Sequence, residues 1–256
     1  DFSKEDVIDD ESVISEGWQR SYWADYGGSE IVYFKEGLSF SAFVKGVPVK
    51  GNYINGRKGT GEHINGTNGD DVLDGKGGPD TIFGRDGNDQ IYYYGTGEII
   101  DAGAGHDTLR VMSTVKGVDF KTLKNFEVVL FDNRNYSGRA TDIDASSLNS
   151  ALTVIGNAGS SKIKGSKGKN VIDGGGGNDT IWGNVSDDTI NFYGTEAQID
   201  GDGGYNVINS FDNIDLNENV NGSSRFLHIN EVRLAGADSL TARGKLNEAN
   251  VLKGNR

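Results

Sequence analysis

Cysteine is the first residue type that this sequence lacks, and its absence excludes both disulfides and thiolate metal sites. Proline is scarce, with 2 residues against 39 glycines, so the glycine excess indicates many tight turns and excludes polyproline and collagen structures. No apolar run approaches the roughly 18 residues of a membrane-spanning helix, and the opening residues DFSKEDVIDD do not have the pattern of a signal peptide. Hydrophobic residues make up 35% of the 256 positions, which suits a narrow core better than a broad one.

The sequence also lacks the common catalytic motifs. Its three histidines, His63, His106 and His228, are isolated, and none belongs to the H-E-x-x-H motif of zinc proteases. There is no G-x-S-x-G nucleophile elbow, and the glycine run at 174–177 is not followed by the Lys-Ser/Thr of a phosphate-binding loop. We therefore predict that the chain is not an enzyme.

Basic residues are outnumbered by acidic ones. The chain has 25 Lys and Arg against 38 Asp and Glu, a net charge of −13. Such a field disfavours nucleic acid and anionic lipid as partners and favours cations. Many of the acids lie in a regular pattern, so metal binding explains them better than solubility alone.

The most regular stretch is glycine-rich and runs from residue 66 to residue 92. Divided into nines it reads GTNGDDVLD, GKGGPDTIF and GRDGNDQIY, with Asp at each sixth position and an aliphatic residue at each eighth. The same phase covers six consecutive nines at 57–110 and returns for six more at 156–209. A single Gly/Asp cluster would indicate only a surface turn, but twelve nines in two unbroken phases are too regular for that interpretation.

These nines resemble the glycine-rich nonapeptide of the RTX, or hemolysin-type calcium-binding, repeat family. The resemblance implies an all-β fold, a right-handed parallel β-roll or β-solenoid, with Ca2+ as its ligand. It also implies type I secretion and a secreted, extracellular or cell-surface location. There, repeats that stay unfolded in the low-calcium cytosol meet enough calcium to fold.

The nine-residue period has a direct physical interpretation. Its last three residues form a short strand, in which period-two alternation buries the eighth residue and exposes the seventh and ninth. Two strands and two turns make one coil of two nines, so the eighth-position residues stack into two facing columns. Burial of each contributes about 2 kcal/mol, which does not offset the entropy of ordering nine glycine-rich residues. We therefore expect metal to supply the missing stability.

The metal sites are predicted between the turns of adjacent coils. Glycines let the turn aim carbonyl oxygens inward, the sixth-position carboxylate adds charged oxygens, and calcium accepts about six to eight such ligands. One turn supplies only half of a shell, so each nine pairs with the second nine after it. The predicted ligands are the carboxylates Asp71, Asp80, Asp89, Asp107, Asp179 and Asp188 and the turn residues Gly66, Asn68, Gly75, Gly77, Gly84 and Asp86.

This pairing makes the two arrays unequal. In the first array the sixth-position residues are Asp71, Asp89 and Asp107 on one edge and Glu62, Asp80 and Glu98 on the other, where the longer Glu is expected to bind more weakly. In the second array they are Asn170, Asp188 and Asn206, and Ser161, Asp179 and Ala197. No Asp there has an Asp partner two nines away, and nearby positive charge at Lys162, Lys164, Lys167 and Lys169 is expected to replace part of the missing calcium. We predict that calcium concentrates in 66–110 and that 156–209 is largely held without it.

The chain divides into three predicted units: an N-terminal β cap or preceding module at 1–55, a first array plus spacer at 56–155, and a second array plus spacer at 156–256. The arrays form a duplication offset by 99 residues, in which GGPDTIF at 77–83 matches GGNDTIW at 176–182. Glu127-Val128 in the first spacer is matched to Glu231-Val232 in the second, and 251–256 resembles the start of a third array, as expected for a piece of a longer repeat protein. Strands are predicted at 126–131 and 152–155 in irregular spacer coils, and at 30–34 and 38–44 as a hairpin.

Two groups of aromatic residues admit more than one interpretation. Trp18, Tyr22, Trp23 and Tyr26 suit the cap of a solenoid end, which prevents the addition of further strands. They also suit a surface for carbohydrate stacking. Phe83 and its duplicate Trp182, at ninth positions, suit packing under the spacer coils or a stripe that stacks against a ligand.

Three functions remain open at this stage. The first is a calcium-binding structural or adhesive module of a large secreted or cell-surface protein, which the tandem duplication favours. The second is the calcium-folding repeat region of an RTX toxin or secreted enzyme. The third is a carbohydrate-binding accessory module with a cell-surface glycan or host surface as partner.

Overall fold

The fold comes from a computed structural model. It describes residues 18–25, 28–35, 40–44, 47–112, 115–118, 120–131, 140–220, 222–235, 241–243 and 251–253, and only the strands, not the side chains, within 18–51, 242–243 and 251–253. The described residues contain β-strands and no helix, and therefore no helix long and apolar enough to cross a membrane. The predicted all-β fold is confirmed.

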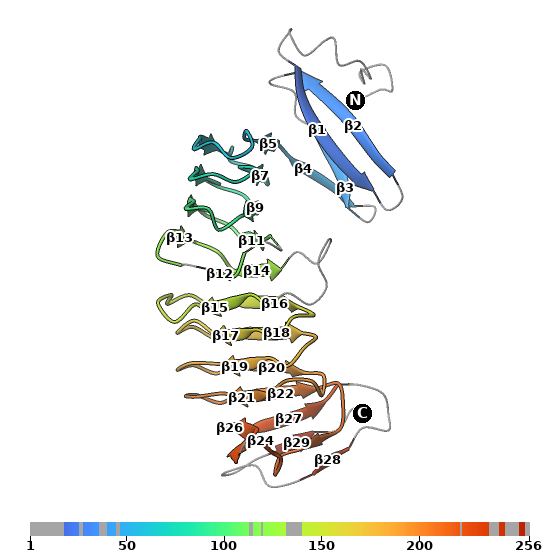
Figure 1. The fold of residues 1–256 in the computed structure, drawn as a ribbon, viewed down its shortest axis with the longest axis vertical. Helices are drawn as coiled ribbons and strands as arrows, with labels where there is room; N and C mark the ends of the chain where they lie inside the picture. The colour runs from blue at the N-terminus through green and yellow to red at the C-terminus, as the bar shows by residue number, and fades with distance from the viewer. Residues whose placement is uncertain are drawn as a thin grey trace.

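One parallel sheet, called here the long sheet, runs the length of the stack (Figure 1). Its strands, in spatial order, are β5 (Tyr53–Asn55), β7 (Val72–Asp74), β9 (Gln90–Tyr93), β11 (Thr108–Val111), β14 (Val128–Phe131), β16 (Thr153–Asn157), β18 (Val171–Gly175), β20 (Thr189–Phe192), β22 (Val207–Ser210), β27 (Glu231–Leu234) and β29 (Val251–Lys253). The predicted spacer strands at 126–131 and 152–155 are β14 and β16, and they join the two arrays. Both arrays and the spacer between them therefore form one rod.

The opposite face of the rod consists of two shorter parallel sheets. The first contains β6 (His63–Asn65), β8 (Thr81–Phe83), β10 (Ile99–Asp101) and β13 (Leu123–Lys124). The second contains β12 (Gly117–Val118), β15 (Asp142–Asp144), β17 (Lys162–Lys164), β19 (Thr180–Trp182), β21 (Gln198–Asp200) and β26 (Phe226–Leu227). The break falls in the spacer, because β13 pairs back onto β10 whereas β12 pairs forward onto β15.

Each coil contains two nines, as predicted. Leu73 on β7 pairs with Ile91 on β9, 18 positions later, and Ile172 on β18 pairs with Ile190 on β20. The eighth-position side chains of both arrays are at most 5% exposed: Ile64, Leu73, Ile82, Ile91, Ile100, Leu109, Ile163, Ile172, Ile181, Ile190, Ile199 and Ile208. Because residues on either side of them face outward, the core is two facing columns of aliphatic side chains.

The spacer register differs from the one that the sequence comparison suggested. Leu109 pairs with Val129 on β14, and its duplicate Ile208 pairs with Val232 on β27. Val129 is therefore the structural equivalent of Val232, and the match of Glu127-Val128 to Glu231-Val232 is wrong by one residue. In a strand, a shift of one residue exchanges the buried and exposed faces, and only the register with both valines inward fills the column.

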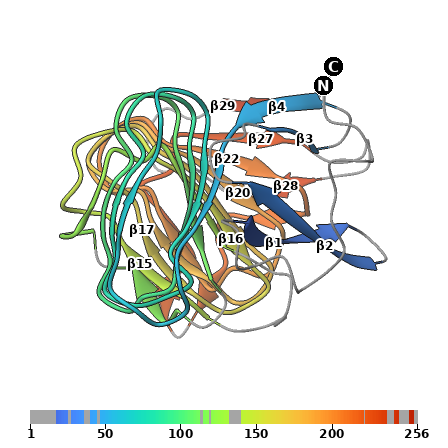
Figure 2. The ribbon, with the colours of Figure 1, turned by 90° about the horizontal axis from the view of Figure 1, so that it is seen from above.

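The segment before the rod forms two antiparallel hairpins, β1 (Trp18–Asp25) with β2 (Gly28–Lys35), and β3 (Phe40–Val44) with β4 (Val47–Gly51). The predicted hairpin of 30–34 with 38–44 is therefore wrong in its pairing. In the described residues neither hairpin pairs with β5, and in the view along the rod both are seen on the side of the long sheet (Figure 2). The side chains proposed for a cap or a sugar surface, Trp18, Tyr22, Trp23 and Tyr26, lie outside the described residues.

Two small pairs complete the described strands near the C-terminal end of the rod. β23 (Ile214–Asp215) pairs in parallel with β28 (Ala242–Arg243), and β24 (Asn219–Val220) pairs with β25 (Ser223–Ser224) as a short antiparallel ribbon. β29 pairs with β27 as β16 pairs with β14. The resemblance of 251–256 to the beginning of the second array thus extends to its strand pairing.

Candidate metal sites

The sixth-position side chains lie in two rows along the edges of the rod. We call the row in the turns that lead into the long sheet the entering edge, and the row in the turns that lead out of it the leaving edge. The entering edge carries Asp71, Asp89 and Asp107 in the first array and Asn170, Asp188 and Asn206 in the second. The leaving edge carries Glu62, Asp80 and Glu98, then Ser161, Asp179 and Ala197.

Carboxylates on the entering edge are held one coil apart by a ladder of hydrogen bonds. The backbone N–H of Asp71 donates to Oδ1 of Asp89 at 2.8 Å, and that of Asp89 donates to Oδ1 of Asp107 at 2.7 Å. The spacer continues the ladder, since the N–H of Asp107 donates to Oε2 of Glu127 at 2.8 Å. Each nine is thus joined to the second nine after it, which brings Asp71, Asp89 and Asp107 into one row.

The second oxygen of most of these carboxylates has no partner. Oδ2 of Asp80, Asp89, Asp107, Asp179 and Asp188 is buried and accepts no hydrogen bond. A buried, unpaired carboxylate is unfavourable, and burial raises the pKa of Asp89 and of Asp179 to about 7. Five such oxygens at equivalent positions indicate sites for a cation with oxygen ligands.

In most nines the first residue is a glycine, and it leaves room beside that oxygen. A Cβ on Gly84 would lie against Oδ2 of Asp89 and the carbonyl oxygen of Ala102, and a Cβ on Gly75 would lie against Oδ2 of Asp80. Gly66 is placed in the same way against Asp71 and the carbonyl of Gly84. The predicted residues Gly66, Gly75 and Gly84 thus line a space in which carboxylate and carbonyl oxygens meet, and this oxygen-only donor set fits calcium.

The remaining predicted turn residues are placed differently. Gly77 is buried and has a φ of 75°, the left-handed region that favours glycine. Asn68 and Asp86, at third positions, have exposed side chains, so only their backbone belongs to the turn. Asp71 differs from Asp89 and Asp107 in its second oxygen. Its Oδ2 accepts hydrogen bonds from the N–H and the hydroxyl of Thr67.

The glutamates of the leaving edge bind their own turns. Glu98 accepts the N–H of Tyr94 at 2.9 Å and the N–H of Thr96 at 2.7 Å. Glu62 accepts the N–H of Arg57 at 2.6 Å. The extra methylene lets the carboxylate reach back to these donors, so on this edge of the first array Asp80 is the residue with the unpaired oxygen.

The second array contains donors that the sequence analysis did not identify. The side-chain amide of Asn170 donates to turn carbonyls, and that of Asn206 does the same one full coil beyond Asp188. Arg225, which is 9% exposed, donates to the carbonyls of Gly194 and Glu196. In the sequence, the amides of Asn170 and Asn206 are indicated only by Asn at the sixth position, where other nines have Asp.

The lysines that were expected to replace part of the missing calcium lie on outward positions. Lys162, Lys167 and Lys169 are exposed, and Lys164 is on an outward position of β17. In the described part of the chain, Asn170, Asn206 and Arg225 donate to turn carbonyls of this array, as do Asn184 to Gly165 and Ser186 to Lys167. That the charge of these lysines replaces part of the calcium stays a prediction.

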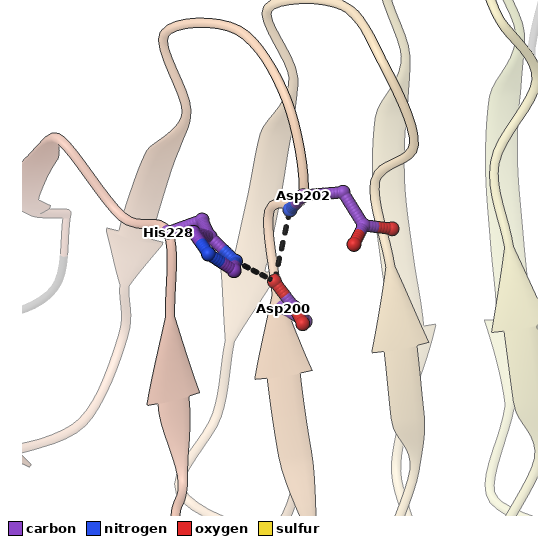
Figure 3. A group of neighbouring side chains, drawn as sticks. All are labelled: Asp200, Asp202 and His228. Atoms are coloured by element: carbon purple, nitrogen blue, oxygen red, sulfur yellow. Dashed lines mark hydrogen bonds and ion pairs between the residues drawn. The ribbon is translucent and has the colours of Figure 1, made fainter.

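A second group of acids lies at the end of β21 (Figure 3). Oδ1 of Asp200 accepts the N–H of Asp202 at 2.9 Å and contacts Nδ1 of His228 at 2.6 Å, and this carboxylate raises the pKa of the imidazole. Ligand atoms of the three residues lie within 4.8 Å of one another. The charge of Asp200 is already compensated by two donors, so we assign no metal to this group.

A cavity of about 930 Å³ lies over the outer face of the second short sheet. Its lining includes Phe120 of the spacer, Lys162, Lys164, Trp182 and Asp202. Trp182 is half-buried there, whereas its duplicate Phe83 is 41% exposed. The two duplicated aromatics therefore have different surroundings.

Comparison with known families agrees with this geometry. Residues 65–95 and 154–191 match the model of the RTX calcium-binding nonapeptide repeat in four copies. No curated protein matches the chain. Each matched stretch contains turns of both edges. The first includes Asp71, Asp80 and Asp89, and the second includes Asn170, Asp179 and Asp188.

Proposed function

We propose that this chain, which carries RTX calcium-binding repeats in two arrays, is a calcium-binding structural or adhesive module of a large secreted or cell-surface protein. The module folds where calcium is plentiful. Its predicted ligands remain the carboxylates Asp71, Asp80, Asp89, Asp107, Asp179 and Asp188 with the backbone of the neighbouring turns.

The observation that carries this proposal is the row of unpaired, buried carboxylate oxygens. Asp89 and Asp107 each have one oxygen in the ladder and one without a donor. Three carboxylates in one row repel one another unless a cation lies between them. Calcium supplies that charge and accepts the surrounding carbonyl oxygens in a flexible geometry.

A structural role agrees with the shape of the rod. The long sheet passes through both arrays and through the spacer between them without interruption. Each coil contacts mainly its neighbours, so length is gained by adding coils. Such a rod suits reach and display better than it suits a compact catalytic site, and we propose no enzymatic role.

The test is a calcium titration of the full chain followed by circular dichroism and equilibrium dialysis. We expect β-structure to increase with calcium and to decrease in chelator, with an affinity suited to extracellular calcium. A chain that binds no calcium, or that is fully folded in chelator, would contradict calcium-driven folding. The sequence of the whole parent protein separates an adhesin or surface-layer protein from a toxin or secreted enzyme.

The cavity over the second short sheet favours one further candidate, a glycan-binding role. An aromatic ring beside carboxylates and ammonium groups offers a stacking face and hydrogen-bond partners, as at Trp182, Lys164 and Asp202. Glycan-array binding that is lost in Trp182→Ala and kept in Phe83→Ala would support it. Binding that is unchanged in both variants would exclude this cavity.

A further inference from the structure

The sixth-position asparagines of the second array stand where the first array has carboxylates. Asn170 and Asn206 are both fully buried, as are Asp89 and Asp107. Asn and Asp have nearly the same shape, but the side-chain nitrogen of Asn donates hydrogen bonds where the second oxygen of Asp only accepts them. In the turns of Asn170 and Asn206 the difference from an Asp turn is therefore one atom of the side chain.

The nitrogen of Asn170 lies among four oxygens. Its Nδ2 is 3.0 Å from the carbonyl oxygen of Ser166, 2.8 Å from that of Gly168, 3.1 Å from that of Gly183 and 2.9 Å from Oδ1 of Asp188. The first two belong to its own turn and the last two to the next coil. They are the kinds of oxygen, turn carbonyls and a carboxylate of the neighbouring coil, that a calcium ion between coils requires.

The equivalent atom of the first array is an oxygen without a donor. A Cβ on Gly165 would meet Nδ2 of Asn170 and the carbonyl of Gly183, and a Cβ on Gly84 would meet Oδ2 of Asp89 and the carbonyl of Ala102. The two atoms therefore occupy the same place in their turns. Oδ2 of Asp89 has no hydrogen-bond partner there, whereas Nδ2 of Asn170 has four oxygen neighbours.

Asn206 repeats the arrangement one full coil beyond Asp188. Its Nδ2 donates to the carbonyls of Gly203 at 3.1 Å and His228 at 3.0 Å, while its Oδ1 accepts the N–H of Asp188 at 3.0 Å. Asp188 thus lies between two neutral amides, whereas Asp89 lies between two carboxylates. The entering edge of the second array has no pair of adjacent carboxylates to hold apart.

We propose that the amides of Asn170 and Asn206 are built-in replacements for calcium in their own two turns of the entering edge, while Asp188 between them keeps its unpaired Oδ2 as a ligand. This inference rests on the proposed function and specifies where calcium is not needed. Because the long sheet joins the arrays through β14 and β16, the second array is a preformed end on which the coils of the first array assemble when calcium arrives.

The test exchanges the two residue types in the full chain. Hydrogen-exchange mass spectrometry in chelator and in calcium is expected to show the wild-type amides of β18 and β20 protected in both conditions, and those of β9 and β11 protected only in calcium. Asn170→Asp is expected to lose protection at β18 and β20 in chelator by roughly tenfold to hundredfold, because a buried carboxylate then faces turn carbonyls. Calcium should restore that protection, with additional bound calcium measured by equilibrium dialysis.

Asn170→Ala and Asp89→Asn are the matched controls. Asn170→Ala removes the donor without adding a ligand, so its loss of protection is expected in both conditions and calcium does not restore it. Asp89→Asn is expected to bind less calcium and to gain protection at β9 in chelator.

Two outcomes would overturn the inference: an Asn170→Asp variant that is as protected in chelator as the wild type, or a wild type whose two arrays lose protection together. If the wild-type chain binds no calcium at all, the proposed function fails as well. If the first array binds calcium and Asn170→Asp gains none, only this inference fails.

Discussion

The two arrays share one backbone and differ at its edges. The N–H of Asp71 donates to Oδ1 of Asp89 at 2.8 Å in the first array, and the N–H of Asn170 donates to Oδ1 of Asp188 at 2.7 Å in the second. The ladder is therefore the same whether the donor residue is Asp or Asn. What changes is the second atom of the side chain, an unpaired oxygen at Asp89 and a bonded nitrogen at Asn170.

This difference shows that the residues that form the coil are not the residues that would bind a cation. The aliphatic columns and the parallel pairing continue through both arrays, so they do not require a particular residue at the sixth position. Under the proposed function, the charge of that residue decides whether a turn takes up a cation. One fold then combines calcium-dependent and calcium-independent coils.

Removal of calcium should produce the largest difference between the two arrays. In chelator we expect the first array, 66–110, to lose its β-structure because its carboxylates repel one another, while 156–209 keeps its own. Limited proteolysis of the full chain, with the fragments identified by mass, measures this directly. Cleavage of both arrays at the same rate would remove the distinction between them.

Truncation of the aliphatic columns should affect both arrays equally. Ile91→Ala and Ile190→Ala remove side chains that are 0% exposed at equivalent positions, and each is expected to lower the free energy of unfolding by about 2–5 kcal/mol in calcium. Urea denaturation followed by circular dichroism measures the change. A much larger loss for Ile91→Ala would mean that the arrays differ in their core and not only at their edges.

Arg225 tests whether a protein donor also closes the last turn of the leaving edge. Arg225→Gln leaves the carbonyls of Gly194 and Glu196 without their donor, with an expected loss of about 1–3 kcal/mol. Its control is Lys162→Gln, because the side chain of Lys162 is exposed and such surface substitutions change the free energy of unfolding by less than about 0.5 kcal/mol. Thermal unfolding in chelator compares them, and equal losses would show that Arg225 has no special role.

Acidification should have the smallest effect and should stabilise the metal-free rod. Burial raises the pKa of Asp89 to about 7 and that of Asp188 to about 6, both above the value of 3.8 for an exposed Asp. Protonation therefore favours the folded state, and this stability is present at acidic pH and lost as the pH rises through 6 to 7. The stability contributed by Asp89 should therefore be lost at a higher pH than the stability contributed by Asp188.

Melting temperatures in calcium-free buffer between pH 5 and pH 8 measure this effect. In calcium the dependence should reverse, since protons compete with the metal for the same oxygens. A metal-free melting temperature that rises with pH would contradict the burial of these carboxylates.

Much of the fold follows from local pattern. The nine-residue phase correctly predicted the strands that contain Leu73, Ile82 and Ile91, because a buried residue between two outward ones is a property of any short strand. The pairing of Asp71 with Asp89 followed from the same period. The spacer was harder, since without a fixed period the sequence match aligned Glu127 with Glu231, one residue away from the register of the sheet.

The candidate sites were predictable in kind but not in detail. Asp80, Asp89 and Asp107 were expected to face the turns, and their unpaired oxygens do so. The self-bonded Glu98 was not foreseen, because whether a side chain reaches its own turn or the next coil depends on distances of a few ångströms.

By itself the sequence determined the repeat, its alternation and the position of every acid, because these depend on chemistry within nine residues. Only the tertiary structure decided that both arrays form one rod, that the valines of the spacers set its register, and that the Asn170 nitrogen lies among oxygens from two coils. Each of these depends on contacts between residues 13 or more positions apart. Such contacts leave no local pattern, so the stacking of the coils alone establishes them.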